Sequence, residues 1–336
     1  MTQPSPRISA VRPLWAVEGG RVTIDGDGFP AGSSLPRVSI GGSPARLASA
    51  SARSITVIVP DGLEGGRMPV RLDDAPGETA FVEVGAPLAT GLHQVDSPVF
   101  DMDGNLYVTF SGSRGQQAPV SIYVVRPDGS REPFVSDIAN PTSLALDDEG
   151  RLHVSSRFDG CVYRVDADGS AATVATDLGV ACGIAFGPDG ALFVGDRSGS
   201  VLRVTDGEVA PFATLPPSVA AFHLAFGPDG WLYVTAPTLG TRDSVYRISR
   251  AGKVEVFYEG FGRPQGLAFD AHGHLYVVDA LAGAGGVYRL RLDGAPDPEQ
   301  VVSRGALVGL AFDPRGGVVL ASSETVYRLH VSTVRS

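Results

Sequence analysis

Residues 266–277 read Gly-Leu-Ala-Phe-Asp-Ala-His-Gly-His-Leu-Tyr-Val, which is an apolar strand, a glycine turn and a second, alternating strand. The turn and its second strand occur six times, at residues 101–108, 147–154, 187–194, 227–234, 270–277 and 313–320. Successive copies start 46, 40, 40, 43 and 43 residues apart. Glycine in each turn permits the positive φ of a tight hairpin. A strand-based repeat of about 40–45 residues is typical of a β-propeller blade.

A third strand related to Val-Tyr-Arg-Val follows the hairpin in most units, and a weaker fourth strand closes them. We therefore predict an all-β protein with a six-bladed β-propeller, in which each apolar first strand lines the axis. The sixth unit runs out of chain after its third strand. Residues 87–93 are expected to supply its fourth strand, which would close the ring and leave no open edge.

Residues 1–85 do not carry this repeat. Short alternating strands are predicted there at residues 21–24, 37–40, 54–59, 68–72 and 80–84. Strands of this length over about 80 residues indicate a small immunoglobulin-like β-sandwich. The predicted domains are residues 1–85 and 86–336.

Composition restricts the partners. The chain has 37 acidic and 27 basic residues, a net charge of −10, and this field would repel nucleic acid. Apolar runs are too short to span a membrane. Cys161 and Cys182 are too few for a disulfide framework or a cysteine zinc site, so we read them as buried thiols, with one bridge as the alternative.

The compartment and the oligomeric state are expectations only. The first residues lack a basic-then-apolar leader, which favours the cytoplasm. Export or cell-surface display is the alternative if a leader has been removed. A monomer is expected.

The first domain resembles the immunoglobulin-like IPT/TIG family over residues 6–84. The resemblance rests on Gly-Gly at 19–20, Thr-Ile-Asp-Gly-Asp-Gly-Phe at 23–29, Gly-Gly-Ser-Pro-Ala at 41–45 and Val-Pro-Asp-Gly at 59–62. It implies a spacer or contact module. Some members bind DNA, and the acidic charge here argues against that role.

The rest of the chain, from Leu88, resembles the SMP-30/gluconolactonase and NHL-repeat group through its Leu-Ala-Phe-x-x-x-Gly-x-Leu-Tyr-Val unit. That group holds lactonases, lyases and binding scaffolds, so the resemblance implies architecture more than activity. In the lactonases it implies a divalent metal at one mouth of the axial channel, held by a Glu, two Asn and an Asp. The equivalent positions here are Asp96, Thr142, Cys182, Phe222, Gln265 and Val308.

Asp96 is the single carboxylate in this set, whereas calcium, magnesium or manganese requires several hard oxygen ligands. A metal at Asp96 is therefore kept only as an alternative. Asp96 and His223 are the catalytic candidates, because either could act as a general base. Cys182 beside His223 could be a nucleophile, but no third residue supports it. Asp196 and Asp279 end second strands and either orient a substrate or, as we prefer, cap amides of the following loop.

Two long loops, residues 110–120 and 236–244, are expected over the same mouth, where binding commonly resides. Phe110, Arg114, Phe222 and Arg242 would there form an aromatic and cationic entrance for a small anionic or aromatic ligand. The complete predicted ligand-binding set is Asp96, Phe110, Arg114, Thr142, Cys182, Asp196, Phe222, His223, Arg242, Gln265 and Asp279.

We prefer a binding or scaffold propeller whose ligand, a small molecule or a protein, sits at the axial mouth, with the first domain as spacer or contact module. The alternative is an SMP-30-like lactone hydrolase or a related lyase with an atypical site.

Overall fold

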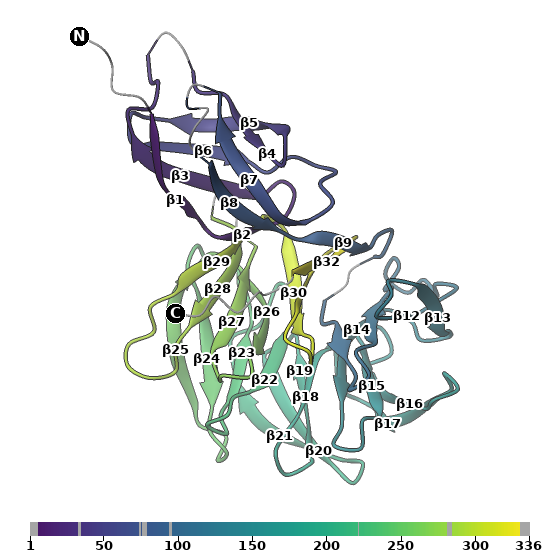
Figure 1. Ribbon diagram of the computed structural model, residues 1–336. Helices are drawn as coiled ribbons and strands as arrows, with labels where there is room; N and C mark the ends of the chain where they lie inside the picture. The colour runs from purple at the N-terminus through teal and green to yellow at the C-terminus, as the bar shows by residue number, and fades with distance from the viewer. Residues whose placement is uncertain are drawn as a thin grey trace, which may run out of the picture.

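The computed structural model describes residues 6–32, 35–73, 75, 79–93, 96–220, 222–280 and 284–329. All regular secondary structure within these ranges is β-strand, as predicted (Figure 1). No helix in them is long and apolar enough to cross a membrane.

The N-terminal domain is a β-sandwich. Its strands are β1 (Arg7–Arg12), β2 (Trp15–Ala16), β3 (Arg21–Asp27), β4 (Val38–Ile40), β5 (Ser43–Ala50), β6 (Ser54–Ile58), β7 (Gly66–Leu72) and β8 (Thr79–Val84). Alternate residues of β3 and β6, such as Ile24 and Ile55, point into one core with Ile40 and Val70. The five strands expected from alternation are present. β1 and β5 were not predicted, and β5 has no fully buried side chain, so it carries no clear apolar face.

The propeller is a ring of four-stranded units, numbered here as blades 1 to 6. Blade 1 consists of β10 (Val99–Phe100), β11 (Leu106–Thr109), β12 (Ile122–Val125) and β13 (Arg131–Val135). Blade 2 consists of β14 (Pro141–Leu146), β15 (Leu152–Ser156), β16 (Cys161–Val165) and β17 (Ala171–Ala175). Blade 3 consists of β18 (Ala181–Phe186), β19 (Leu192–Asp196), β20 (Ser200–Thr205) and β21 (Glu208–Thr214).

Blades 4 to 6 complete the ring. Blade 4 consists of β22 (His223–Phe226), β23 (Leu232–Thr235), β24 (Asp243–Ile248) and β25 (Val254–Phe261). Blade 5 consists of β26 (Pro264–Phe269), β27 (Leu275–Asp279), β28 (Gly286–Leu290) and β29 (Glu299–Ser303). Blade 6 consists of β30 (Leu307–Phe312), β31 (Val318–Ser322), β32 (Val326–Leu329) and β9 (Ala86–Ala89). Each blade is an antiparallel meander with its first strand innermost, and β9 pairs with β32 as predicted, which closes the ring.

The prediction of six blades requires a correction. In the described residues five blades are separate four-stranded sheets, whereas β26–β29, the unit numbered blade 5, belong to a 12-stranded sheet shared with the N-terminal domain. The link is β2, which pairs in parallel with β29 on one side and with β8 on the other. β2 therefore covers the outer edge of blade 5, an edge that would otherwise expose unpaired backbone groups.

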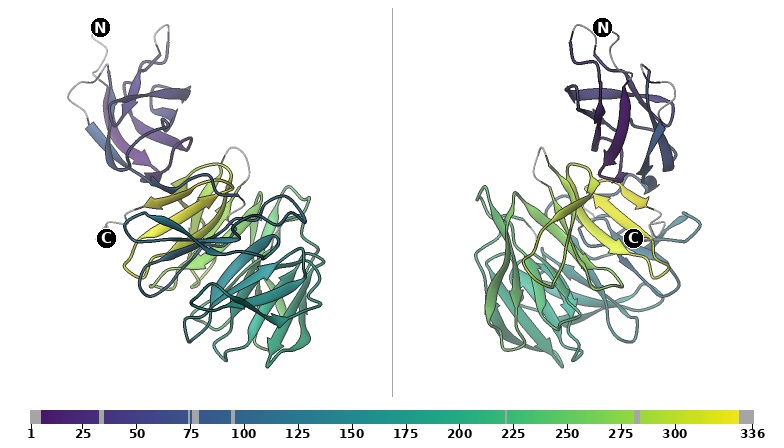
Figure 2. Two further views of the ribbon diagram at one scale, coloured as in Figure 1. Left: turned by 90° about the vertical axis from the view of Figure 1, so that its right-hand side faces the viewer. Right: turned by 60° about the vertical axis from the view of Figure 1, so that its left-hand side comes forward.

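Side chains reinforce this junction. The Tyr327 hydroxyl donates to Glu18 Oε1 over 2.7 Å, and the Arg21 N–H donates to Ser303 Oγ over 2.8 Å. Gly85 lies between β8 and β9, and a Cβ on it would lie 2.7 Å from Val17 Cγ1. The N-terminal domain stands to one side of the ring beside blades 5 and 6 (Figure 2). We keep the division at residues 85 and 86 as a proposal.

The meander gives the propeller two distinct faces. The turns between first and second strands lie on one face. The loops between second and third strands lie on the other, together with the connections that lead into the next first strand. We call this second face the mouth face.

Candidate ligand-binding site

The mouth face carries a pocket of about 710 Å³ over blades 1 to 3. Every lining residue comes from a second-to-third strand loop or from a connection leading into a first strand. The lining residues are His93, Gly112, Ser113, Arg114, Arg157, Phe158, Val180, Arg197, Ser198 and Ser218. The pocket is thus built from loops held by rigid blades, and none of its lining residues is acidic.

Three consecutive blades each contribute one arginine. Arg157 directly follows β15 and Arg197 directly follows β19, so they occupy the same place in blades 2 and 3. Arg157 Nη2 donates to Ser111 Oγ over 3.2 Å, and Arg197 Nη2 donates to the Val219 carbonyl over 2.9 Å. Arg114 projects from the longer loop of blade 1 and is exposed. These contacts orient the two inner guanidinium groups.

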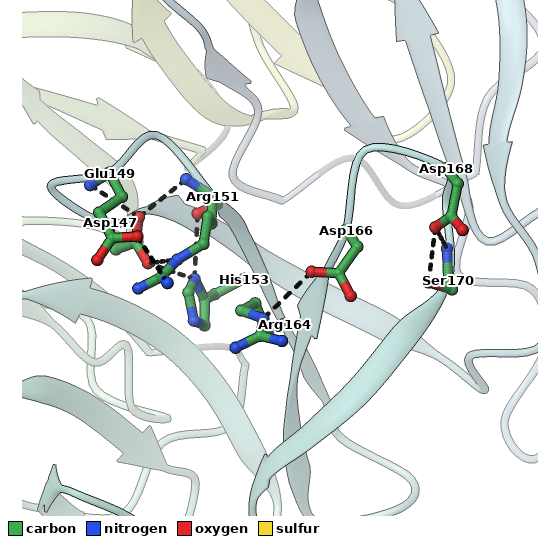
Figure 3. Close-up of polar contacts among 8 residues, drawn as sticks. All are labelled: Asp147, Glu149, Arg151, His153, Arg164, Asp166, Asp168 and Ser170. Carbon is green, nitrogen blue, oxygen red and sulfur yellow. Dashed lines mark hydrogen bonds and ion pairs between the residues drawn. The ribbon is translucent and has the colours of Figure 1, made fainter.

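Several other arginines of the propeller lie beside carboxylates. In blade 2, Arg151 pairs with Asp147 and with Glu149 at 2.7 Å each, and Arg164 pairs with Asp166 at 3.3 Å (Figure 3). Arg203, Arg247, Arg289, Arg291 and Arg315 have similar partners. Within the described residues, Arg114 and Arg197 form no ion pair of this kind, and both line the pocket.

Asn140 organises the loop that carries Arg114. Its Oδ1 accepts from the Gly115 N–H over 2.6 Å, and its Nδ2 donates to the Ser111 and Ser113 carbonyls over 2.5 and 2.9 Å. Asn140 is buried at φ 46°, a left-handed conformation that asparagine tolerates better than most residues. The loop is therefore preformed.

Phe158 adds an apolar surface to the rim. Its ring is 53% exposed and packs over Gly115, where a Cβ would lie 2.9 Å from Cε2. Sequence reasoning identified Arg114 but missed Asn140, Arg157, Phe158 and Arg197. Aligning the blades on the ends of their second strands would have placed Arg157 and Arg197 together.

Most of the six positions at or just before the starts of the innermost strands are closed to a ligand. Thr142, Cys182, Phe222 and Gln265 are buried, while Asp96 and Val308 are partly buried. The Thr142 hydroxyl donates to the Asn140 carbonyl over 3.2 Å. Phe222 packs where a Cβ on Gly195 would be, in the core between blades 3 and 4. Phe222 is therefore not part of an entrance.

The titratable groups among these six residues have shifted pKa values. Burial raises the pKa of Asp96 to about 6, and Arg157 acts in the opposite direction. Burial, with Asp96 nearby, raises the pKa of the Cys182 thiol to about 12. Cys182 is thus a neutral thiol at physiological pH, which argues against a nucleophilic role.

His223 directly follows Phe222, the blade 4 member of this set, and is buried. The residues at the equivalent position of the other blades are small: Ser97, Ser143, Gly183, Gly266 and Gly309. Ser97 Oγ lies 3.2 Å from His223 Nδ1, although the two residues belong to blades 1 and 4, with two blades between them on either side. Burial lowers the pKa of His223 to about 4, so the imidazole is neutral. Nε2 is buried and has no hydrogen-bond partner among the described residues.

Asp196 and Asp279 have the hydrogen bonds of capping residues. Asp196 Oδ1 accepts from the Val180 N–H over 2.8 Å, and Asp279 accepts from the Gly262 and Arg263 N–H groups over 3.0 and 2.7 Å. These amides belong to the connection that leads into the same blade, rather than to the following loop as expected.

The predicted aromatic and cationic entrance is not assembled from the four residues named for it. Phe110 packs against His93 and Tyr123, with ring centroids 5.9 and 6.2 Å apart. Arg242 is exposed but does not line the pocket, because its loop joins β23 and β24 of blade 4 and the pocket lies over blades 1 to 3. Asp243 accepts hydrogen bonds from the Thr238 N–H and hydroxyl in the same loop. Of the four, Arg114 alone lines the pocket.

The residues around Asp96 do not fit a hard divalent cation. No group of three or more His, Cys, Asp and Glu side chains suited to a metal occurs in the described ranges. Asp96 faces a thiol and the field of Arg157, whereas calcium and magnesium select several oxygen ligands. We derive no chemistry through a metal.

Comparison with known proteins supports the architecture. Residues 6–81 match the model of the IPT/TIG domain family. No curated protein matches the chain in sequence. Among solved structures, an auxiliary nutrient binding protein from Bacteroides thetaiotaomicron is similar over 97% of this chain and 98% of its own, with 14% identity and a TM-score of 0.58.

Two enzyme structures are similar as well. A structural-genomics target named as a candidate gluconolactonase matches over 73% of this chain and 91% of its own, with 19% identity and a TM-score of 0.59. A catalytically inactive virginiamycin B lyase from Staphylococcus aureus, solved with quinupristin, matches over 98% and 97%, with 15% identity and a TM-score of 0.55. Identities this low establish a shared fold and leave function to the site.

Proposed function

We propose that this protein is a binding propeller that holds a small molecule in the mouth-face pocket over blades 1 to 3. The observation that carries the proposal is a preformed pocket of about 710 Å³ whose outer loop is fixed by the buried Asn140 side chain. Ligand sites are typically preformed concave surfaces of a few hundred Å³ with a few oriented polar groups. A pocket of this size favours a small molecule over a protein as the occupant.

The N-terminal domain is proposed as a fixed contact module. β2 joins its sheet to blade 5, and Glu18 and Tyr327 are hydrogen bonded across the junction, so a freely swinging spacer is disfavoured. The domain would present the propeller to a partner in one orientation.

A ligand screen on the full chain tests the binding proposal. Ser113→Trp would fill the pocket, because Ser113 lines it and is exposed. The matched control is Ala251→Trp, which lines a cavity of about 660 Å³ on the opposite face. Ligands that stabilise the wild type in thermal unfolding should lose their effect with Ser113→Trp and keep it with Ala251→Trp. The reverse pattern would place the site on the other face and refute the proposal.

A hydrolase or lyase is the second candidate, and one observation favours it. Asp96 is a partly buried carboxyl group beside the pocket arginine Arg157, with a pKa raised to about 6, which suits a general acid or base near neutral pH. Lactone hydrolysis that is lost in Asp96→Asn, while ligand binding is retained, would support catalysis. Equal turnover by Asp96→Asn would exclude Asp96 as the acid or base.

A further inference from the structure

We propose that the mouth-face pocket is specific for an aromatic carboxylate, an anionic head group joined to a planar apolar body. This inference rests on the proposed function and specifies the ligand class for that site. Two features of the pocket carry it, the guanidinium groups of Arg114 and Arg197 and the exposed ring at its rim.

The charge is local and opposes the charge of the whole protein. The chain has a net charge of −10, yet three arginines and no acidic residue line this pocket. Arg197 is oriented by the Val219 carbonyl, which leaves further guanidinium N–H groups for a ligand. Guanidinium groups bind carboxylate oxygens through charge-assisted and often bidentate hydrogen bonds. A neutral ligand would leave the guanidinium groups of Arg114 and Arg197 without an anionic partner.

The apolar feature is Phe158. Phe158 is the exposed large apolar side chain among the residues that line this pocket. Phe158 is 53% exposed and packs over Gly115, in the loop that carries Arg114. Offset or edge-to-face contact with a second ring stabilises such an arrangement. A small inorganic anion would contact the arginines and leave this ring unused.

Pocket serines complete the recognition surface. Ser113 and Ser198 line the pocket near Arg114 and Arg197. The Ser198 hydroxyl donates to Asp196, so its oxygen remains able to accept a hydrogen bond from a ligand hydroxyl. A hydroxyl group on the aromatic body is therefore compatible with the pocket.

The test measures binding of four probes to the full-length protein by ligand-observed NMR and calorimetry at millimolar concentrations. Benzoate carries both features, benzamide removes the charge, and acetate and inorganic phosphate remove the ring. We expect benzoate to bind at least about tenfold more tightly than each of the others, since a charge-assisted pair is worth roughly that much in affinity. Benzoate binding should also weaken as salt rises, because salt screens exposed charges.

Substitutions test which residues provide the positive charge and which provides the aromatic contact. Arg114→Gln and Arg197→Gln should each weaken benzoate binding about tenfold, and Phe158→Ala should reduce the preference for benzoate over acetate without changing acetate affinity. Arg203→Gln is the matched control, because Arg203 pairs with Asp189 beside the cavity on the opposite face. Arg114 is exposed and makes no hydrogen bond or ion pair within the described chain, so its substitution does not threaten folding.

The outcomes separate this inference from the proposed function. If benzamide binds as tightly as benzoate and Ser113→Trp abolishes both, the binding function stands and the anionic class is wrong. If phosphate binds at the same pocket and benzoate does not, the aromatic class is wrong. If neither these probes nor a wider screen yields a ligand sensitive to Ser113→Trp, both proposals fall.

Discussion

Asn140 offers the sharpest test of how the pocket is built. Its side chain makes three hydrogen bonds to backbone groups of residues 111–115, each between 2.5 and 2.9 Å. At about 1 kcal/mol for each net hydrogen bond, they contribute about 3 kcal/mol. Asn140→Ala should lose this amount, and a further cost of roughly 1 kcal/mol follows because alanine tolerates φ 46° poorly.

Two further variants separate the contribution of the hydrogen bonds from that of the backbone conformation. Asn140→Gly loses the hydrogen bonds but keeps the backbone conformation, so it should be about 1 kcal/mol more stable than Asn140→Ala. Asn140→Asp keeps an acceptor for the Gly115 N–H and loses both donors, so it should fall between the wild type and Asn140→Gly.

Urea unfolding measures the free energies, and hydrogen exchange at the Gly115 amide reports the loop directly. Asn140→Ala and Asn140→Gly should accelerate exchange at Gly115 and weaken ligand binding at Arg114, whereas Asn140→Asp should retain more of the protection at Gly115. Wild-type stability in Asn140→Ala, with unchanged exchange at Gly115, would refute the argument that this side chain preforms the pocket.

Three further predictions follow from the buried groups. His223 has a pKa near 4, below its ordinary value of 6.5, so its contribution to stability is present above pH 6.5 and is lost as the pH falls toward 4. His223→Gln should lack this part of the acid sensitivity in unfolding curves recorded from pH 7 to pH 4, and curves parallel to the wild type would contradict it. Cys182 should resist thiol reagents until the protein unfolds, whereas the partly exposed Cys161 should react in the native state; equal labelling rates would show that Cys182 is accessible. Tyr327→Phe should lower the free energy of unfolding in urea by about 1–3 kcal/mol, because it leaves the Glu18 carboxylate without its hydroxyl donor. An unchanged unfolding midpoint would show that this hydrogen bond does not stabilise the junction.

Much of the fold could be predicted because its determinants are local. Glycine turns followed by alternating strands specify a hairpin within about ten residues, and six copies at regular spacing specify a ring of blades. The closing strand was predicted because the last unit lacked a fourth strand, and β9 occupies that place. β2 was not predicted because its two residues, Trp15–Ala16, are too few to show an alternating pattern. They pair with the edge of β29 only in the folded state.

The candidate site, too, could be predicted only in part. From the sequence alone we predicted that two long loops would lie over the mouth and that Arg114 would be on one of them. The sequence also determined that four of the six metal-ligand positions carry neither a carboxylate nor an amide. Only the tertiary structure decided that Arg157 and Arg197 join Arg114 and that Phe222 is buried against blade 3. The physical reason is distance along the chain. Residues some 40 positions apart meet through the packing of neighbouring blades, and no local pattern records which side chains then face one another.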